Sequence, residues 1–223
     1  MTRAALLFDL DGTLVETDDL HHAAFAGILA EDGRALSFAD YRDRILGKPN
    51  VEIMAWLMPD AAPERHAEIA DRKEAAYRAM LAAEFEPVAG VRPLLDWAEA
   101  NGVGVAVVTN APRLNAEAVL AATGLAGRIA TLVIGEECAR PKPDPLPYQE
   151  AMRRLGVTPS GSIAFEDSRS GLRAARGAGA LVFGLTTALP AAELLQAGAH
   201  QAIPDFTDPA LWVALNALKA RVA

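Results

Sequence analysis

The sequence predicts an α/β fold in which a parallel sheet carries an inserted block of helices. Three observations support this prediction. A short apolar run at residues 4–8 leads directly into two aspartates. Residues 16–86 then show the helical spacing of apolar side chains and no strand pattern. From residue 87 onward, strand and helix patterns alternate, which is typical of parallel strands covered by helices.

The expected fold class is therefore a Rossmann-like parallel sheet core with an inserted all-α helical cap domain. Residues 1–15 and 87–223 would form the core, and residues 16–86 the cap. The chain would cross between them twice, near residues 15–16 and 86–88. Two linkers allow a hinge, and a hinged block above a sheet edge acts as a lid.

Four helical segments are expected in the cap, at residues 20–29, 41–46, 51–58 and 64–85. Thr17 or Asp18 is a suitable N-cap for the first segment. Ser37, with Asp40 three residues later, resembles a capping box for the second.

Five strands are expected in the core, at residues 4–8, 103–108, 131–134, 162–165 and 181–185. The second is a near-continuous β-branched run, as in strands buried on both faces. Helices are expected at residues 93–100, 115–122, 145–155, 171–178 and 209–219.

Composition limits the classes of partner. The net charge of −8 leaves no basic surplus for a nucleic acid backbone, so no nucleic acid partner is expected. No apolar run approaches the roughly 20 residues of a membrane helix, so we expect no membrane partner. The single cysteine, Cys138, fits a reducing compartment, so the expected location is the cytoplasm. We expect the chain to be a monomer or homodimer.

Polar side chains follow three of the predicted strands at their carboxyl ends. They are Asp9 and Asp11, Thr109 and Asn110, and Glu166 and Asp167. Side chains two residues apart on an extended chain point the same way, so the first two acids aim at one spot. Ligands of open α/β sheets bind beyond these strand ends, and we expect a site there.

The residue types gathered at this edge suit a phosphoryl group. Clustered carboxylates fit Mg²⁺, and Lys142, in a loop bounded by prolines, adds a cation. The metal, lysine and threonine hydroxyl would stabilise phosphoryl charge during transfer. One aspartate could act as nucleophile while the other transfers a proton.

Four motifs in this order carry a family resemblance. They are Asp-x-Asp-Gly-Thr at residues 9–13, Thr109-Asn110, Lys142-Pro-x-Pro, and Phe-Glu-Asp-Ser at residues 165–168. With them the chain resembles the haloacid dehalogenase superfamily phosphatases. It is most similar to the subgroup of phosphoglycolate phosphatases and β-phosphoglucomutases, which has a helical cap after the first motif.

The resemblance implies a Mg²⁺-dependent phosphatase that acts on a small phosphorylated metabolite through an aspartyl-phosphate. It implies the following roles: Asp9 as nucleophile, Asp11 as general acid/base that also offers its backbone carbonyl to Mg²⁺, Thr109 for phosphate, and Lys142 to orient nucleophile and phosphate. It implies a metal site made of Asp9, Asp11, Asp167 and, beside it, Glu166.

Three alternatives to a phosphatase are weighed against the residues. The dehalogenase branch lacks an acid two residues after the nucleophile, so Asp11 favours phosphoryl transfer. A sugar-phosphate mutase of the β-phosphoglucomutase type is the alternative enzyme, because His21 lies where that resemblance places a cap histidine. The arginine pattern of the mutases is missing from residues 46–50, which favours a phosphatase. A phospho-accepting receiver domain also clusters acids, but such modules lack a helical insertion.

Further candidates for substrate contact are weaker, because each has an ordinary structural explanation: His21, Lys48, Asn110 and Arg113. Trp56, Trp97 and Trp212 lie in apolar stripes and are expected to pack. The pairs Arg72-Lys73 and Arg153-Arg154 are expected on solvated faces.

Overall fold

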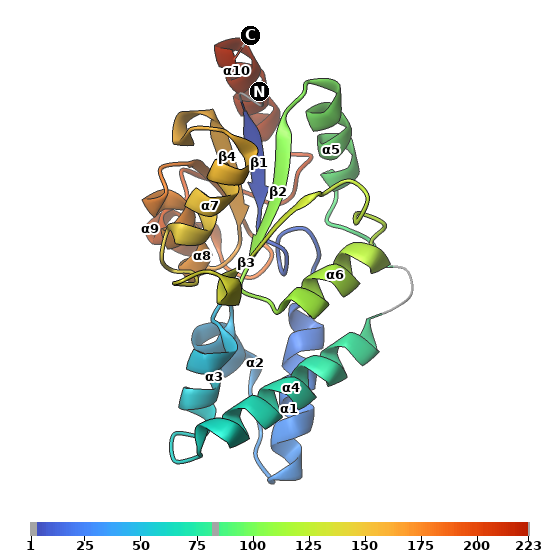
Figure 1. The fold of residues 1–223 in the computed structure, drawn as a ribbon, viewed down its shortest axis with the longest axis vertical. Helices are drawn as coiled ribbons and strands as arrows, with labels where there is room; N and C mark the ends of the chain where they lie inside the picture. Colours follow the sequence, from blue (N-terminus) through green and yellow to red (C-terminus); the bar gives the residue numbers. More distant parts are fainter. Residues whose placement is uncertain (1–3, 82–84, 223) are drawn as a thin grey trace.

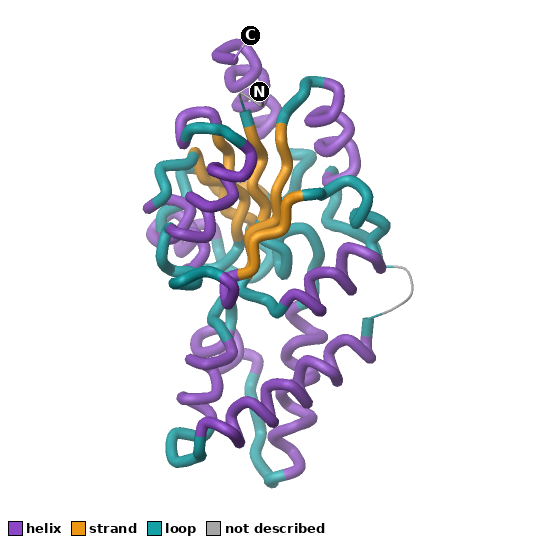
Figure 2. Tube along the Cα trace, viewed as in Figure 1, coloured by secondary structure: helices purple, strands orange, loops and turns teal. Residues whose placement is uncertain are grey.

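The computed structural model describes residues 4–81 and 85–222, without the side chains of the last two. A six-stranded sheet has the order β3-β2-β1-β4-β5-β6 with every pairing parallel. Its strands are drawn orange in Figure 2. They are β1 (Ala5–Phe8), β2 (Gly104–Thr109), β3 (Thr131–Ile134), β4 (Ser162–Glu166), β5 (Leu181–Leu185) and β6 (Gln201–Ile203). The chain order reverses at β1, so the first strand lies where such sheets bind ligands.

Helices cover both faces of this sheet (Figure 1). They are α5 (Val91–Ala100), α6 (Arg113–Ala122), α7 (Leu146–Leu155), α8 (Arg169–Gly177), α9 (Ala191–Ala197) and α10 (Pro209–Val222). Alternate side chains of β1 enter opposite cores, because successive residues of a strand face opposite ways. Leu6 and Phe8 join the cluster that includes α5 and α10, whereas Leu7 joins the one under α7 and α8.

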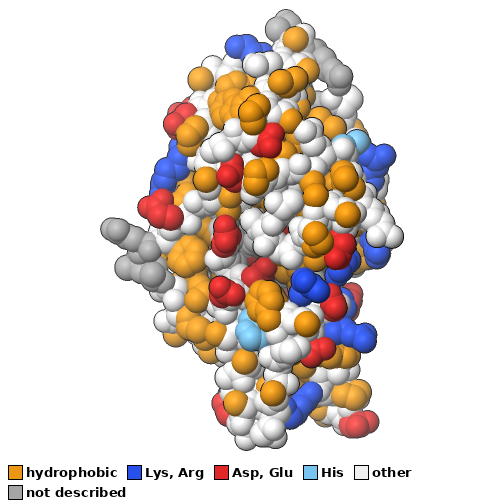
Figure 3. Space-filling model, turned by 180° about the vertical axis from the view of Figure 1, so that it is seen from behind, with side chains coloured by type: hydrophobic (Ala, Val, Ile, Leu, Met, Phe, Trp, Pro, Cys, Tyr) orange, Lys and Arg blue, Asp and Glu red, His pale blue; other side chains and the backbone are white. Residues whose placement is uncertain are grey.

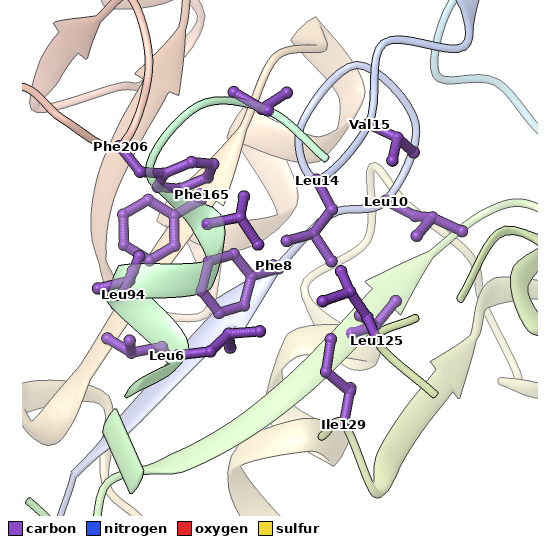
Figure 4. Packing of buried hydrophobic residues seen from close by; sticks show 14 of the residues in the cluster. Leu6, Phe8, Leu10, Leu14, Val15, Leu94, Leu125, Ile129, Phe165 and Phe206 are labelled. Carbon is purple, nitrogen blue, oxygen red and sulfur yellow. The ribbon is translucent and has the colours of Figure 1, made fainter. Parts of the chain in front are cut away.

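Aromatic packing secures β1 beside β4. The ring of Phe8 stacks on Phe165 at 4.8 Å, and Phe206 meets Phe165 edge-on at 5.1 Å (Figure 4). Burying aromatic side chains is strongly stabilising, and offset or edge-on geometry adds to it. The strand that ends in Asp9 is therefore rigidly held.

A second unit of helices lies beyond the carboxyl ends of the strands (Figure 1). It comprises α1 (Asp18–Glu31), α2 (Phe38–Asp40), a π-helical turn at Tyr41–Ile45, α3 (Asn50–Leu57) and α4 (Pro63–Met80). These helices bury a hydrophobic cluster of their own, around Phe25, Tyr41 and Met54. We propose residues 16–86 as the cap on this ground.

The α/β fold class is confirmed, and most predicted elements lie where expected. The edge strand β6 and the helix α9 were not predicted. The strand has three residues and only Ile203 fully buried, too short to show a period. The predicted helix at 64–85 ends at Met80, and positions 82–84 lie outside the described residues.

Two helices of the cap differ from prediction. The segment at 41–46 is a π-helical turn that follows a single turn of α-helix, and the Ser37 hydroxyl accepts from the backbone N–H of Asp40 at 3.0 Å, as expected. Thr17 occupies the N-cap of α1, but its hydroxyl donates to Asp11 instead of capping. The start of α1 is therefore tied to the acid at the sheet edge.

Surface features of the described residues are ordinary for a globular chain. None of the described helices combines the length and apolar character that crossing a bilayer requires. On the face opposite to that of Figure 1, basic side chains lie among acidic ones (Figure 3).

Candidate active site

Three neighbouring strands end at one cavity, which the cap helices close from the other side. Phe8 pairs with Val107 of β2 and with Phe165 of β4, so the residues just beyond these pairs lie side by side. The cavity is lined by core residues Asp9, Asp11, Thr109, Asn110, Lys142 and Asp167 and by cap residues that include His21, Lys48, Asn50 and Lys73.

Lys142 connects two of the acids. Its side chain is 2% exposed, and its ammonium donates to Asp9 Oδ1 at 2.6 Å and to Glu166 Oε1 at 2.5 Å. The Tyr148 hydroxyl also donates to Glu166 Oε1, at 2.8 Å. Lys142 thus holds one oxygen of Asp9 in place, as expected of a group that orients a nucleophile.

Asn110 holds the lysine loop. Its Oδ1 accepts from the backbone N–H of Lys142 at 3.2 Å, and its Nδ2 donates to the Lys142 carbonyl at 3.1 Å. The same Nδ2 donates to the carbonyl of Gly47 in the cap at 3.2 Å. Asn110 therefore positions two loops at the cavity that it lines.

Three buried carboxylates form a donor set for a cation. Oxygens of Asp9, Glu166 and Asp167 all lie within 4.8 Å of one another. Asp167 Oδ1 accepts from the Thr13 hydroxyl at 3.1 Å, whereas its buried Oδ2 has no hydrogen-bond partner among the described residues. An unsatisfied buried carboxylate oxygen is costly, and a hard cation would satisfy it. The donor set therefore fits Mg²⁺.

Glu166 contributes differently from Asp9 and Asp167. One of its oxygens accepts from Lys142 and Tyr148, and the other accepts from the Ser168 hydroxyl at 3.1 Å. Because both oxygens have partners, we interpret Glu166 as the residue that positions Lys142. Asp9 and Asp167 are then the better candidates for direct metal ligands.

The loop after β1 leaves no room for a side chain at Gly12. Its φ is +75°, and an added Cβ would lie 2.3 Å from Asp167 Oδ2. The Thr187 hydroxyl donates to the Gly12 carbonyl at 2.5 Å, which holds the turn. The glycine of the first motif is thus required for the carboxylates to converge.

The two aspartates of the first motif differ in their proton affinity. Burial and the nearby Glu166 carboxylate raise the pKa of Asp9 to about 8, although Lys142 opposes this. A divalent cation would lower it again, since opposite charge favours the ionised form. Burial would also raise the pKa of Asp11, but His21, Thr17 and Lys73 outweigh it and lower that pKa to about 2.

Asp11 is surrounded by hydrogen-bond donors, of which His21 and Thr17 lower its pKa. Its Oδ1 accepts from the Thr17 hydroxyl at 2.6 Å, from His21 Nε2 at 3.2 Å and from the Tyr77 hydroxyl at 3.2 Å. Donors to a carboxylate favour its ionised form. All three donors belong to the segment 16–86, so the cap sets the state of this acid.

Lys73 is a site residue that the sequence reasoning missed. It was expected on a solvated face, but it is 2% exposed, and only Arg72 is exposed, paired with Glu31. Lys73 Nζ lies 2.9 Å from His21 Nδ1, so the ring accepts there and donates from Nε2 to Asp11. The signal was present: Lys73 shares helical spacing with the buried Ile69 and Tyr77.

The remaining predicted residues divide between the cavity and the surface. Lys48 and His21 line the cavity. Thr109 is buried there, and its hydroxyl accepts from the backbone N–H of Ala111 at 2.9 Å. Arg113 has a side chain that is 41% exposed and pairs with Glu137 at 2.6 Å, so the structure does not bring it to the cavity lining.

The tryptophans divide similarly. Trp97 and Trp212 pack against the core as expected. Trp56 is 40% exposed, so the expectation that it packs was wrong.

Comparison with known proteins agrees with this geometry. The sequence profile described as haloacid dehalogenase-like hydrolase matches residues 6–185. Protein CbbY of Rhodobacter capsulatus is 36% identical over 80% of this chain and 83% of its own. A phosphoglycolate phosphatase of Xylella fastidiosa is 33% identical over 78% and 76%. A beta-phosphoglucomutase of Mycobacterium bovis is 32% identical over 92% and 90%.

A solved structure shows the same arrangement over nearly the whole length. The crystal structure of a mutant of CbbY from Rhodobacter sphaeroides, in complex with xylulose-(1,5)bisphosphate, superposes with a TM-score of 0.83. It covers 93% of this chain and 96% of its own, at 30% identity. The chain therefore belongs to the haloacid dehalogenase-like hydrolases. Within that family it is a phosphoric monoester hydrolase.

Proposed function

We propose that this chain is a Mg²⁺-dependent phosphatase that hydrolyses a small phosphorylated metabolite through an aspartyl-phosphate on Asp9. The observation that carries the proposal is that two acids two residues apart, Asp9 and Asp11, are held by different groups. Lys142 orients Asp9, whereas three cap donors hold Asp11. In the free enzyme the pKa of Asp9 is raised and that of Asp11 is lowered, so each acid must change its protonation before it acts. Mg²⁺ would ionise Asp9, and the bound phosphate would raise the pKa of Asp11.

In the first step, an oxygen of Asp9 attacks phosphorus and the bond to the ester oxygen breaks. Asp11 gives a proton to the leaving oxygen. It is ionised in the free enzyme, so it must take up that proton when the negatively charged phosphate binds beside it and raises its pKa. In the second step, water attacks phosphorus, Asp11 takes the water proton, and the bond to Asp9 breaks with release of phosphate. Mg²⁺ held by Asp9, Asp167 and the backbone carbonyl of Asp11 would offset the repulsion between phosphate and carboxylates.

Residues on the core side would bind the transferring group. Lys142 lies against Asp9, and Thr109 is buried at the end of β2. Both line the cavity, together with Asn110. We propose that Thr109 and Lys142 contact the phosphate, while Asn110 keeps their loops in place.

The cap side of the cavity suits a polar substrate. His21, Lys48 and Asn50 line it. Both ring nitrogens of His21 already have partners, so Lys48 offers the positive charge and Asn50 its amide oxygen to acidic or hydroxyl groups. Small sugar phosphates or organic acid phosphates are therefore the substrates that we propose. This fits the bisphosphate sugar bound by the CbbY structure. We place the enzyme in the cytoplasm on the basis of its single cysteine.

Replacing the nucleophile tests the mechanism. Asp9→Asn should abolish hydrolysis of 4-nitrophenyl phosphate in the presence of Mg²⁺, because an amide has no carboxylate oxygen with which to form the acyl phosphate. Asp60→Asn is a matched control, since Asp60 is exposed in the cap. Hydrolysis by the Asp9 variant at the rate of the control would exclude the mechanism.

The mutase alternative has one specific observation in its favour, the contact of His21 with Asp11, together with the mutase-named relative. Incubation with β-glucose 1-phosphate and Mg²⁺ separates the two activities. A phosphatase releases inorganic phosphate, whereas a mutase accumulates glucose 6-phosphate. Accumulation of glucose 6-phosphate without free phosphate would replace our proposal by the mutase.

A further inference from the structure

Asn115 joins the core to the cap at a point away from the cavity lining. It lies in the first turn of α6, where α4 of the cap lies against this helix (Figure 1). The residue is 1% exposed, and both ends of its amide are used. Its Nδ2 donates to Glu74 Oε2 at 2.5 Å, and its Oδ1 accepts from Arg78 at 2.7 Å.

The bond from Arg78 determines which way this amide points. A guanidinium has only donors, so the atom that faces Arg78 must be the oxygen. The nitrogen then faces Glu74, where it donates to a carboxylate. Such a charge-assisted hydrogen bond is stronger than one between neutral groups.

Glu74 is the start of a continuous hydrogen-bonded chain that ends at Asp11. Both of its oxygens lie 3.1 Å from Lys73 Nζ, which in turn lies 2.9 Å from His21 Nδ1. His21 Nε2 lies 3.2 Å from Asp11 Oδ1. Glu74 also accepts from Asn50 at 2.8 Å. Lys73, Asn50 and Asn115 thus all hold a carboxylate that is 5% exposed.

Every link between Glu74 and His21 belongs to the cap, whereas Asn115 and Asp11 belong to the core. The core therefore contacts both ends of this series of hydrogen bonds, Glu74 through Asn115 and His21 through Asp11. If the cap moves away from α6, Glu74 loses a strong donor at one end while His21 leaves Asp11 at the other. A buried carboxylate is sensitive to the loss of a charge-assisted donor, because part of its hydrogen-bonding capacity is then unmet.

We propose that Asn115 is a positioning residue that aligns Glu74, Lys73 and His21, and through them Asp11, when the cap lies against α6. Asn115 contacts neither substrate nor metal in this scheme. Its effect on catalysis rests on the proposed function of Asp11 as the acid/base group. Its effect on the His21 ring does not depend on that function.

The first test reads the His21 ring directly. Long-range ¹H–¹⁵N correlation spectra report which ring nitrogen carries the proton, and the chain has only four histidines, so a His21→Ala spectrum assigns the signals. We expect the Nε2–H form in the parent chain and a shifted His21 signal in Asn115→Ala. Asn115→Asp keeps the shape of the side chain but cannot donate to Glu74, so we expect the same shift. Unchanged His21 signals in both folded variants would overturn the proposal.

The second test uses steady-state kinetics on 4-nitrophenyl phosphate. We expect either variant to lower kcat by about tenfold, which is less than the full contribution of one acid/base group to the rate. We expect KM to change by less than about twofold. In a His21→Ala background the Asn115 substitution should have no further effect, because the hydrogen bonds from Glu74 to Asp11 are already interrupted at His21.

Ser170→Ala is the matched control for a contact that merely holds the cap. The Ser170 hydroxyl donates to the Gly47 carbonyl at 2.6 Å, which joins core and cap outside the chain from Glu74 to Asp11. Its effect should add to that of His21→Ala. Additive effects for Asn115 as well would assign it a merely structural role and overturn the proposal. If the parent chain hydrolyses no phosphate ester, the proposed function fails, and the spectra still decide the role of Asn115.

Discussion

Gly47 offers a direct test of whether closure of the cap matters for activity. It lies in the loop between the π-helical turn and α3, with φ at +69°. Its carbonyl accepts from Ser170 at 2.6 Å and from Asn110 at 3.2 Å, both of them core residues. An alanine here would place its Cβ 2.6 Å from Ser168 Cβ and 2.8 Å from Ser170 Oγ. Gly47→Ala should therefore push the loop off the core.

The expected magnitude follows from these contacts. Losing two hydrogen bonds to the Gly47 carbonyl costs about 1–3 kcal/mol in total. The left-handed backbone adds about 1–2 kcal/mol of strain for alanine. Only the lost hydrogen bonds oppose closure, since the strain is present in the open form as well. We expect kcat/KM to fall by a factor of about 5 to 150.

The assay is kcat/KM with 4-nitrophenyl phosphate, with the midpoint of thermal unfolding measured in parallel. Gly33→Ala is the control, because its φ is also left-handed at +66° while an added Cβ meets nothing within 4 Å. The control carries the strain without the collision, so it should lower stability and leave kcat/KM unchanged. If Gly47→Ala retains kcat/KM within twofold of the control, the reasoning about cap closure is wrong.

Three further predictions concern the buried charges. Lys142→Met leaves Asp9 and Glu166 without their shared cation, so it should lower the free energy of unfolding by about 3–5 kcal/mol, measured by urea denaturation, and abolish hydrolysis. Equal stability to the parent would contradict this. Gly171→Ala would place a Cβ 1.8 Å from Glu166 Oε1 and should destabilise by about 1–3 kcal/mol in the same assay. Retention of the parental urea midpoint would refute the close packing. Burial raises the pKa of Asp9 to about 8, above its value in the unfolded chain, so without metal this group makes the fold less stable as pH rises from about 4 to 8. Mg²⁺ must displace that proton, and the rise in Tm on adding Mg²⁺ should be larger at pH 8 than at pH 5; an equal rise at both would count against Asp9 as a ligand.

Much of the fold and of the core site could be predicted from local patterns. Strand and helix periods are properties of neighbouring residues, and parallel strands must all end at the same edge of the sheet. Asp9, Thr109 and Asp167 come together for this reason alone. The turn at Gly12 is equally local, because its backbone conformation suits glycine.

The tertiary structure decided what the cap does to these acids. Lys73 reads as half of a charged pair in the sequence, yet packing against α1 buries it beside His21. The sequence predicts Glu166 as a metal ligand, yet Lys142 and Tyr148 donate hydrogen bonds to one of its oxygens. Arg113 and Asn115 lie two residues apart, and only the second faces α4. Helical spacing can indicate that a polar side chain such as Lys73 lies on the buried face of its helix. Which partner it meets there depends on which distant element covers it, and no local pattern records that.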